Sequence, residues 1–208
     1  LLRMSTDRNS LSVRESKVIL ASQSPERLNL LKQIGINAQV IVSNFDENLS
    51  KDMPVEQFVV QTALGKLYHV RDQLINDKTP FDMIIAADTV IHFENKIIGK
   101  PIDDQDAKRT INALCGRDHD VYTGVAIMFY DRTIVTFFEK TTVTFRKIAQ
   151  STIDSYIGSG GHRGRAGSYG IQRGGAILVD RINGCFSNIV GLPLGRISEH
   201  LEKKGFTL

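Results

Sequence analysis

The apolar residues in the first half of the chain occur as short continuous runs and as stripes with helical spacing. Short runs bounded by turn residues are typical of buried strands, and apolar positions three or four residues apart are typical of helices. Ser24 as N-cap, Pro25 at the first helical position and Gly35 as a stop mark one helix. The pattern predicts strands over 17–21, 40–42 and 82–87, and helices over 25–34 and from Pro54 to about Leu74.

The second half of the chain alternates long extended runs with short helices. Turn residues at Glu94-Asn95 and at 130–133 separate apolar runs, which indicates two hairpins. The predicted elements are strands over 90–93, 96–99, 121–129, 134–145 and 176–179, and helices over 103–114, 149–157 and 193–203. Alternating strands and helices come first and long antiparallel strands follow, so we expect an α/β protein with a mixed sheet.

Residues 1–16 are polar and aperiodic, and we interpret them as a loose N-terminal arm. The remaining residues, 17–208, contain no low-complexity linker and no internal repeat. A chain of 208 residues buries about 70–75% of its unfolded surface, so it needs no disulfide or metal to fold. One domain or two closely packed lobes over 17–208 would both fit a chain of this length.

Composition and charge narrow the classes of protein. The chain has 41% hydrophobic and 24% charged residues, which excludes a fibrous or largely disordered protein. Its 26 Lys and Arg exceed its 23 Asp and Glu by only three, which argues against a dedicated nucleic-acid binder. Cys115 and Cys185 form no CxxC pair, which is typical of a protein from a reducing compartment. No apolar run is long enough to span a membrane, and the first 16 residues lack the apolar stretch of a signal peptide. We expect a soluble cytoplasmic protein without a membrane partner.

Common nucleotide and metalloprotease motifs are absent: there is no GxxxxGK(S/T), no HExxH and no GxSxG. The candidates that remain are charged residues near the ends of predicted strands, where α/β proteins bind ligands. Ser22 to Arg27 lead into a helix N-terminus, whose free N–H groups and dipole favour a phosphate. The alternative is simple capping, with Ser24 as the cap and Glu26 offsetting the helix dipole.

Four further charged residues each have a catalytic and an ordinary interpretation. Asp88 follows an apolar strand and could bind a cation or activate water, or it could cap the next turn. Lys100, fixed by Pro101, suits a phosphate but could be an exposed loop lysine. Lys66 lies beside the apolar face of a helix and could extend its ammonium to solvent. Glu47 could be a metal ligand or a turn residue.

The segment from Gly158 to Gly175 is rich in glycine and arginine and contains no Asp or Glu. Glycine permits close approach of the backbone to a ligand, and Arg163, Arg165 and Arg173 would match phosphate oxygens. An RNA-binding interpretation lacks a series of stacking aromatics, because Tyr169 is the one aromatic in the segment.

Taken in order, these pieces resemble the Maf (septum-formation-inhibitor) family of nucleotide pyrophosphatases. The resemblance runs from Lys17 to Leu201 and is specific through the order and spacing of its motifs rather than through any one of them. The matching stretches are Ile19–Arg27, Asp46-Glu47, Ala63–Lys66, Ala87–Thr89, Gly99–Pro101, Thr123–Val125, Val143–Phe145, Arg165–Gln172 and Asn188–Leu194.

The resemblance implies hydrolysis of a nucleoside triphosphate to the monophosphate and diphosphate with a divalent cation, Mg²⁺ or Mn²⁺. It implies a single catalytic domain of two α/β lobes over 17–208, with an elongated mixed β-sheet between them similar to inosine triphosphate pyrophosphatase, and a homodimer. It makes Asp88 the proton acceptor, and Glu47 with Asp88 the metal ligands. Phosphate binding would fall to Ser22, Ser24, Arg27, Lys66, Lys100 and Arg165. The matches at Ala87–Thr89 and Gly170–Gln172 point to the branch that acts on dTTP and UTP.

In that branch the residue before Arg27, together with Thr89 and Gln172, influences base selectivity. The family usually has a second arginine where this chain has Glu26, and an Asp-Lys pair where it has Gly164-Arg165. We hypothesise that Glu26 lines the nucleotide entrance and accepts hydrogen bonds from a thymine or uracil imide. The alternative is a solvent-facing Glu26 that only complements the helix dipole. The rival functions are a catalytically weak nucleotide-binding regulator of cell division and a nucleic-acid-binding module.

Overall fold

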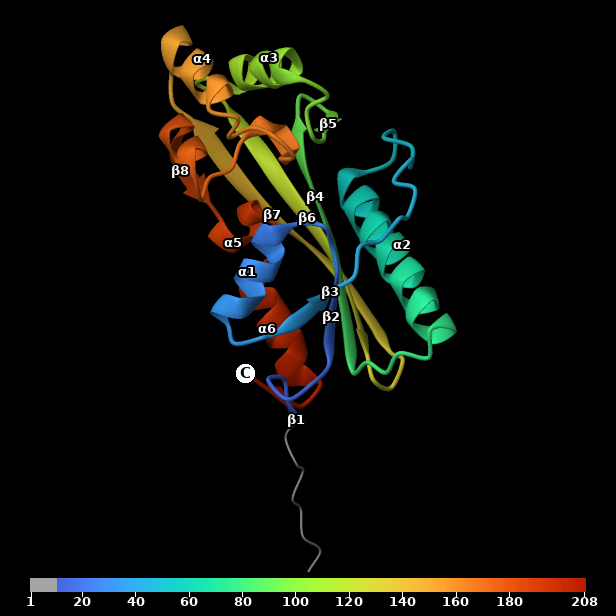
Figure 1. Ribbon diagram of the computed structural model, residues 1–208. Coiled ribbons are helices and arrows are strands. Elements are labelled where there is room, and N and C mark those ends of the chain that lie inside the picture. Colours follow the sequence, from blue (N-terminus) through green and yellow to red (C-terminus); the bar gives the residue numbers. More distant parts are fainter. Residues whose placement is uncertain (1–10) are drawn as a thin grey trace, which may run out of the picture.

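The described part of the chain, residues 11–208 of the computed structural model, contains one large sheet and the helices that cover it (Figure 1). Its strands are β2 (Val18–Ala21), β3 (Ala38–Val40), β4 (Met83–Phe93), β5 (Lys96–Ile98), β6 (Asp118–Phe129), β7 (Ile134–Phe145) and β8 (Val179–Asn183). The order across the sheet is β3-β2-β4-β6-β7-β8, and β5 pairs with β4. Strand β2 runs parallel to β3 and β4, whereas the other pairs are antiparallel, so the mixed α/β sheet is confirmed.

Helices cover both faces of the parallel end of this sheet. They are α1 (Pro25–Gln33), α2 (Val55–Asn76), α5 (Phe186–Val190) and α6 (Leu194–Lys203). Helices α1 and α6 lie on one face and α2 lies on the other (Figure 1). Successive side chains of β4 alternate between the two layers: Ile85 packs with α1 and α6, and Ile84 packs with α2. No helix among residues 11–208 is long and apolar enough to cross a membrane.

A second core forms at the far ends of β6 and β7, under α3 (Asp104–Leu114) and α4 (Gln150–Gly158). Ile111 of α3 and Ile153 of α4 pack there with Phe145 and Tyr169. The long antiparallel strands run through both cores and give the molecule its elongated shape (Figure 1).

The N-terminal residues that the structure describes are paired rather than loose. Strand β1 (Leu11–Ser12) lies parallel to β9 (Phe206–Thr207), and Val13 is buried in the core together with Phe206. The prediction of a loose arm over 1–16 therefore does not hold for residues 11–16, because β1 pairs with β9 and Val13 is buried in the core. Residues 1–10 lie outside the described residues.

Two predicted strands are displaced. Strand β3 is Ala38–Val40 rather than 40–42, because its register places Val40 opposite Leu20 near the end of the short strand β2. The strand predicted over 176–179 is mostly a 3-10 turn, Gly174–Leu178, and pairing with β7 occupies Val179–Asn183 instead. In both cases the position of the neighbouring strand, which is not local information, decides where pairing begins.

Candidate functional site

Asp88 lies in the middle of β4 rather than at a strand end, opposite Gly124 of β6. Predicting a strand end at Asp88 was wrong, because β4 continues without a break to the hairpin at Glu94-Asn95. The Asp88 side chain is only 11% exposed. A carboxylate buried to this extent needs a charged or hydrogen-bonding partner.

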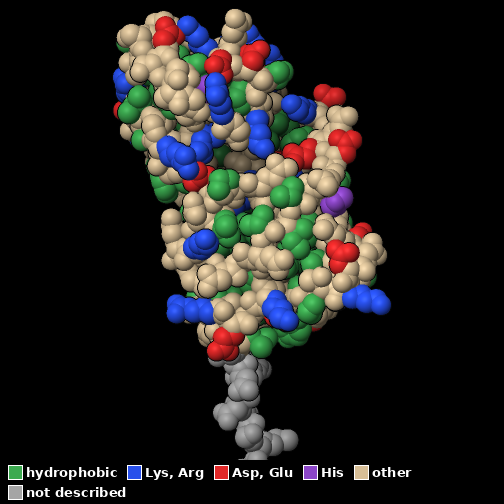
Figure 2. Space-filling view, in the orientation of Figure 1, with side chains coloured by type: hydrophobic (Ala, Val, Ile, Leu, Met, Phe, Trp, Pro, Cys, Tyr) green, Lys and Arg blue, Asp and Glu red, His purple; other side chains and the backbone are tan. Residues whose placement is uncertain are grey.

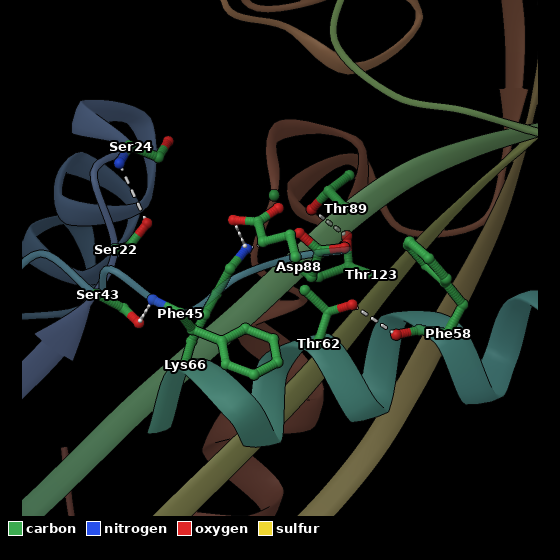
Figure 3. A network of polar contacts seen from close by, with 12 residues as sticks. Ser22, Ser24, Ser43, Phe45, Phe58, Thr62, Lys66, Asp88, Thr89 and Thr123 are labelled. Atoms are coloured by element: carbon green, nitrogen blue, oxygen red, sulfur yellow. Dashed lines mark hydrogen bonds and ion pairs between the residues drawn. The ribbon is translucent and has the colours of Figure 1, made fainter. Parts of the chain in front are cut away.

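That partner is Lys66 of α2. Its Nζ lies 2.8 Å from Asp88 Oδ1 (Figure 3) and 3.0 Å from Glu47 Oε1, so one ammonium joins two carboxylates. Lys66 is itself buried, so the interpretation in which its ammonium extends to solvent is wrong. The Oδ2 atom of Asp88 accepts no hydrogen bond from any residue in the described part of the chain, which leaves it free to accept a proton.

Glycines set the distances around this ion pair. A Cβ on Gly124 would come within 2.3 Å of the Val59 backbone, so α2 can rest directly on β6 only because residue 124 is glycine. A Cβ on Gly65 would come within 2.3 Å of the Phe45 ring. The ring packs there beside Lys66 (Figure 3), and this contact holds the turn that carries Glu47.

Arg27, in the first turn of α1, is fixed by three hydrogen bonds. It donates from Nε to the Gly191 carbonyl (2.9 Å), from Nη1 to Ser22 Oγ (3.2 Å) and from Nη2 to Thr89 Oγ1 (2.9 Å). Thr89 in turn contacts Thr123 Oγ1 at 2.9 Å (Figure 3). Burial lowers the pKa of Arg27, and the charges of Asp88 and Glu47 oppose this shift, which keeps the side chain a cation. Two of its five N–H groups remain for a ligand.

The two serines before Arg27 serve the helix start. Ser24 Oγ accepts the Arg27 backbone N–H at 3.4 Å, and Ser22 Oγ accepts the Ser24 backbone N–H at 3.1 Å. The capping interpretation of Ser24 is thus confirmed, while both side chains also line the cavity described below.

Glu26 points toward the glycine-rich segment rather than toward solvent. Its Oε1 lies 3.2 Å from Nη2 of Arg165 and 2.9 Å from Nη2 of Arg173. Burial would raise the pKa of Glu26, but hydrogen bonds from Arg165 and Gln172 and the two arginine charges outweigh it and lower the pKa. The alternative of a solvent-facing Glu26 is therefore wrong, because its side chain is 11% exposed and paired.

These residues line one cavity of about 630 Å³ between the two ends of the molecule. The predicted site residues that line it are Ser22, Ser24, Glu26, Arg27, Glu47, Lys66, Asp88, Thr89, Lys100 and Arg165. Gln172 does not line it, but it donates a side-chain hydrogen bond to Glu26. The lining contains six Lys or Arg side chains and three carboxylates. Figure 2 shows Lys and Arg side chains gathered around the hollow, which therefore suits a polyanion.

Two contributors were not found from the sequence. Lys51 lines the cavity, but its position in a polar turn gives no signal that separates it from other surface lysines. Phe45 packs against Gly65 and so positions Glu47; the one feature of the sequence that could have indicated this is an aromatic residue within an acidic segment.

Tyr169 also lines the cavity, and its hydroxyl lies 2.9 Å from Nε2 of the buried His119.

A divalent cation fits the donor chemistry of this site. Among residues 11–208 no cluster of three or more His, Cys, Asp or Glu side chains is arranged as a complete metal cage. Glu47 and Asp88 nevertheless converge on one point, the Lys66 ammonium. Mg²⁺ is commonly held by one or two carboxylates together with substrate phosphates, so two carboxylates in a phosphate-sized cavity match its needs.

Comparison with known proteins agrees with this geometry. The family model described as "Maf-like protein" matches residues 17–204. The chain belongs to the Maf family. A dTTP/UTP pyrophosphatase of Acetivibrio thermocellus is 39% identical to this Maf protein over 195 residues, covering 92% of this chain and 97% of the relative. One of Caldicellulosiruptor bescii is 40% identical over 193 residues, covering 92% and 96%.

A solved structure supports the fold of this Maf protein. The HAM1 protein from Coxiella burnetii matches 90% of this chain and 99% of its own length with a TM-score of 0.51. Sequence identity is 16%, so the likeness concerns the fold alone. It confirms the elongated mixed sheet that the family resemblance implied.

Proposed function

We propose that this Maf protein hydrolyses dTTP- and UTP-like nucleoside triphosphates, modified ones included, to the monophosphate and diphosphate. The names of its relatives support the substrate class, because both are dTTP/UTP pyrophosphatases aligned over more than nine-tenths of the chain. The cavity supports the chemistry, because its excess of cations faces a buried carboxylate. The observation that carries the proposal is the Asp88–Lys66–Glu47 cluster inside that cavity.

In this mechanism cationic groups hold the triphosphate and Asp88 accepts a proton. Arg27 presents its two remaining N–H groups, Lys66 can exchange a carboxylate for a phosphate oxygen, and Lys100 approaches from the rim. A water oxygen bonds to phosphorus, the bridging P–O bond between the α- and β-phosphates breaks, and the water proton passes to Asp88 Oδ2. A positioned general base of this kind contributes on the order of 10²–10⁴-fold, and charge stabilisation contributes more.

Glu47 and Asp88 would hold a divalent cation, Mg²⁺ or Mn²⁺. When bound, such an ion neutralises charge on the phosphate oxygens. Both carboxylates pair with Lys66, so the ammonium keeps them close together before the nucleotide arrives.

In this proposal Thr89, Glu26 and Gln172 influence which base is accepted. Thr89 lines the cavity and is held by Arg27, so a change there would also move the phosphate-binding guanidinium. Gln172 does not line the cavity and acts through its hydrogen bond to Glu26.

We expect this Maf protein to be a homodimer located in the cytoplasm, without stable nucleic-acid or membrane partners. Cys115 and Cys185 are free thiols, which agrees with a reducing compartment. Light scattering would measure the oligomeric state, and a tagged protein imaged in cells would report its location.

The test is diphosphate release from a panel of ordinary and modified triphosphates, with Mg²⁺, with Mn²⁺ and after chelation. We expect the fastest release with dTTP or UTP and none after chelation. Asp88→Asn is expected to lower turnover at least ~10²-fold while nucleotide binding persists, because an amide keeps the shape but does not accept the proton. Asp120→Asn is the matched control, since Asp120 also pairs with a lysine at 2.9 Å but lies outside the cavity.

Two outcomes would contradict the proposal. Loss of less than ~10-fold in Asp88→Asn would remove this residue from catalysis. Tight nucleotide binding without diphosphate release under any condition would instead favour the nucleotide-binding regulator.

A further inference from the structure

Glu26 joins two parts of the cavity wall that are far apart in the sequence. It lies in the first turn of α1, and its three polar partners, Arg165, Gln172 and Arg173, all belong to the glycine-rich segment. One carboxylate oxygen, Oε1, lies within 3.2 Å of both guanidinium groups. The carboxylate is thus already occupied by protein partners.

The glycine-rich segment between Arg163 and Arg173 has no strand and only short turns of its own. Glycines let it fold tightly: a Cβ on Gly167 would come 1.9 Å from Ile91 Cδ1, and one on Gly170 would come 2.7 Å from Arg165 Nε. The Gly167 N–H donates to the Gly99 carbonyl at 3.0 Å, next to Lys100. On the opposite side, toward α1, the ion pairs of Glu26 hold the segment.

Removing the Glu26 charge would leave two guanidinium groups facing each other. Arg165 and Arg173 approach the same oxygen atom, so without its charge they repel each other. The cost is higher at Arg165, whose side chain is 18% exposed, than at Arg173, whose side chain is 60% exposed. Removing one member of a buried ion pair strongly lowers the stability of a protein, because the remaining charge is left buried without compensation. The segment would relieve this repulsion by moving away from α1.

We propose that Glu26 is a positioning residue, a latch that fixes residues 163–173 against α1 and so sets Arg165 and Gln172 in place for the nucleotide. It acts through these partners and not by meeting the base itself. The role toward nucleotide rests on the proposed function, whereas the latch is measurable without any substrate.

Hydrogen–deuterium exchange of the full chain without nucleotide tests the latch. Glu26→Gln keeps the size of the side chain and removes its charge, so we expect amides within 163–173 to exchange at least ~10-fold faster while those of β6 and β7 stay unchanged. Glu139→Gln is the matched control, because Glu139 pairs with Arg196 at 3.2 Å and does not line the cavity. Unchanged exchange within 163–173 in Glu26→Gln overturns the latch.

A charge-swapped variant keeps the test decisive if the single variant folds poorly. Glu26→Arg combined with Arg165→Glu restores an opposite-charge pair, so exchange within 163–173 should return toward the wild-type rate. A double variant no better protected than Glu26→Arg alone would reject the pairing.

Kinetics then separate positioning from catalysis. Glu26→Gln should raise KM for dTTP or UTP about 10-fold and leave kcat within about 3-fold, because the reacting groups Asp88 and Lys66 lie elsewhere. An unchanged KM with faster exchange would reject the role toward nucleotide and keep the latch. Absence of diphosphate release in the wild type would reject the proposed function, and the exchange result would still decide the latch.

Discussion

At the scale of single residues, the protein buries some ionisable groups in the charged form and others in the neutral form. Asp88 and Lys66 are buried as a charged pair, whereas His119 is buried without a charged partner. Phe145 and Tyr169 pack edge-on against the His119 ring, with centroids 4.9 and 5.5 Å away. Burial lowers the pKa of His119 to about 4, although Asp118 and Asp120 oppose the shift. At neutral pH this imidazole is uncharged.

This shift predicts a loss of stability in weak acid. The folded-state pKa lies below the ordinary value of 6.5, so the unfolded chain binds the proton first as the pH falls. Stability is therefore lost between pH 6.5 and about 4, by roughly 2–3 kcal/mol at pH 4.5. Urea unfolding at pH 7 and pH 4.5 measures it. His119→Gln, which does not titrate in this range, should lose that much less; equal losses in the two proteins would show that another group is responsible.

The members of the cavity lining were predicted from the charged positions together with the family resemblance. Ten of the eleven predicted site residues line one cavity. Their contacts were not predictable, because Lys66 meets Glu47 and Asp88 only when the turn, α2 and β4 come together. The partners of Glu26 come from a segment 139 residues away, which no local pattern reveals.

At the scale of elements, helix α2 positions the proposed reacting groups through close glycine contacts. Gly65 lies beside Lys66 and admits the Phe45 ring, which holds the turn containing Glu47. Helix α2 thus fixes both the ammonium and one of its carboxylates.

Gly65→Ala is expected to lower kcat/KM at least ~10-fold with little change in melting temperature. The new Cβ would displace Phe45 and with it Glu47, while the better helix propensity of alanine, about 1 kcal/mol, offsets lost ring packing. Gly158→Ala, at the end of α4, is the matched control because nothing lies within 4 Å of its Cβ position. Diphosphate release and thermal unfolding are measured on both. If the two variants were equally active, Phe45 would not position Glu47.

The elements that the sequence predicted correctly have signals within their own residues. Helix α1 has its cap at Ser24 and its stop at Gly35, and the β6–β7 hairpin follows from two long apolar runs. Strand β4 was cut short because a polar pair, Asp88 and Thr89, interrupts its apolar run. Those side chains stay inside the protein because Lys66 and Arg27 pair with them. Tertiary contacts that local sequence does not encode thus overrode the local pattern.

At the scale of the whole molecule, the cavity draws its walls from both cores. Arg27 and Lys66 come from helices over the parallel end of the sheet, while Lys100 and Arg165 come from segments near the second core. The proposed binding of phosphate therefore requires both ends of the long sheet to keep their relative position.

Lys100→Ala is expected to weaken triphosphate binding by about 1.5–3 kcal/mol, or roughly 10–150-fold, the value of one charge-assisted hydrogen bond. The melting temperature should hold, because Lys100 is exposed and supports little packing. Lys96→Ala, on the neighbouring β4–β5 hairpin and outside the cavity, is the control. Calorimetric titration with a non-hydrolysable triphosphate measures binding by both variants, and thermal unfolding measures their melting temperatures. A collapsed melting temperature with normal binding by the folded fraction would make Lys100 structural.

The pairing of β1 with β9 has a consequence for the order of events during synthesis. Leu11 pairs with Phe206, so strand β1 has no partner until almost the whole described chain has emerged from the ribosome. The strands of the large sheet, β2 to β8, all lie between these two partners in the sequence and are therefore made before β9. Val13 and Phe206 belong to the same core cluster, so this part of the core is incomplete until β9 has been made. Pairing of β1 with β9 is therefore a late step when folding begins during synthesis, and Leu11–Val13 is a segment that a chaperone could bind before it.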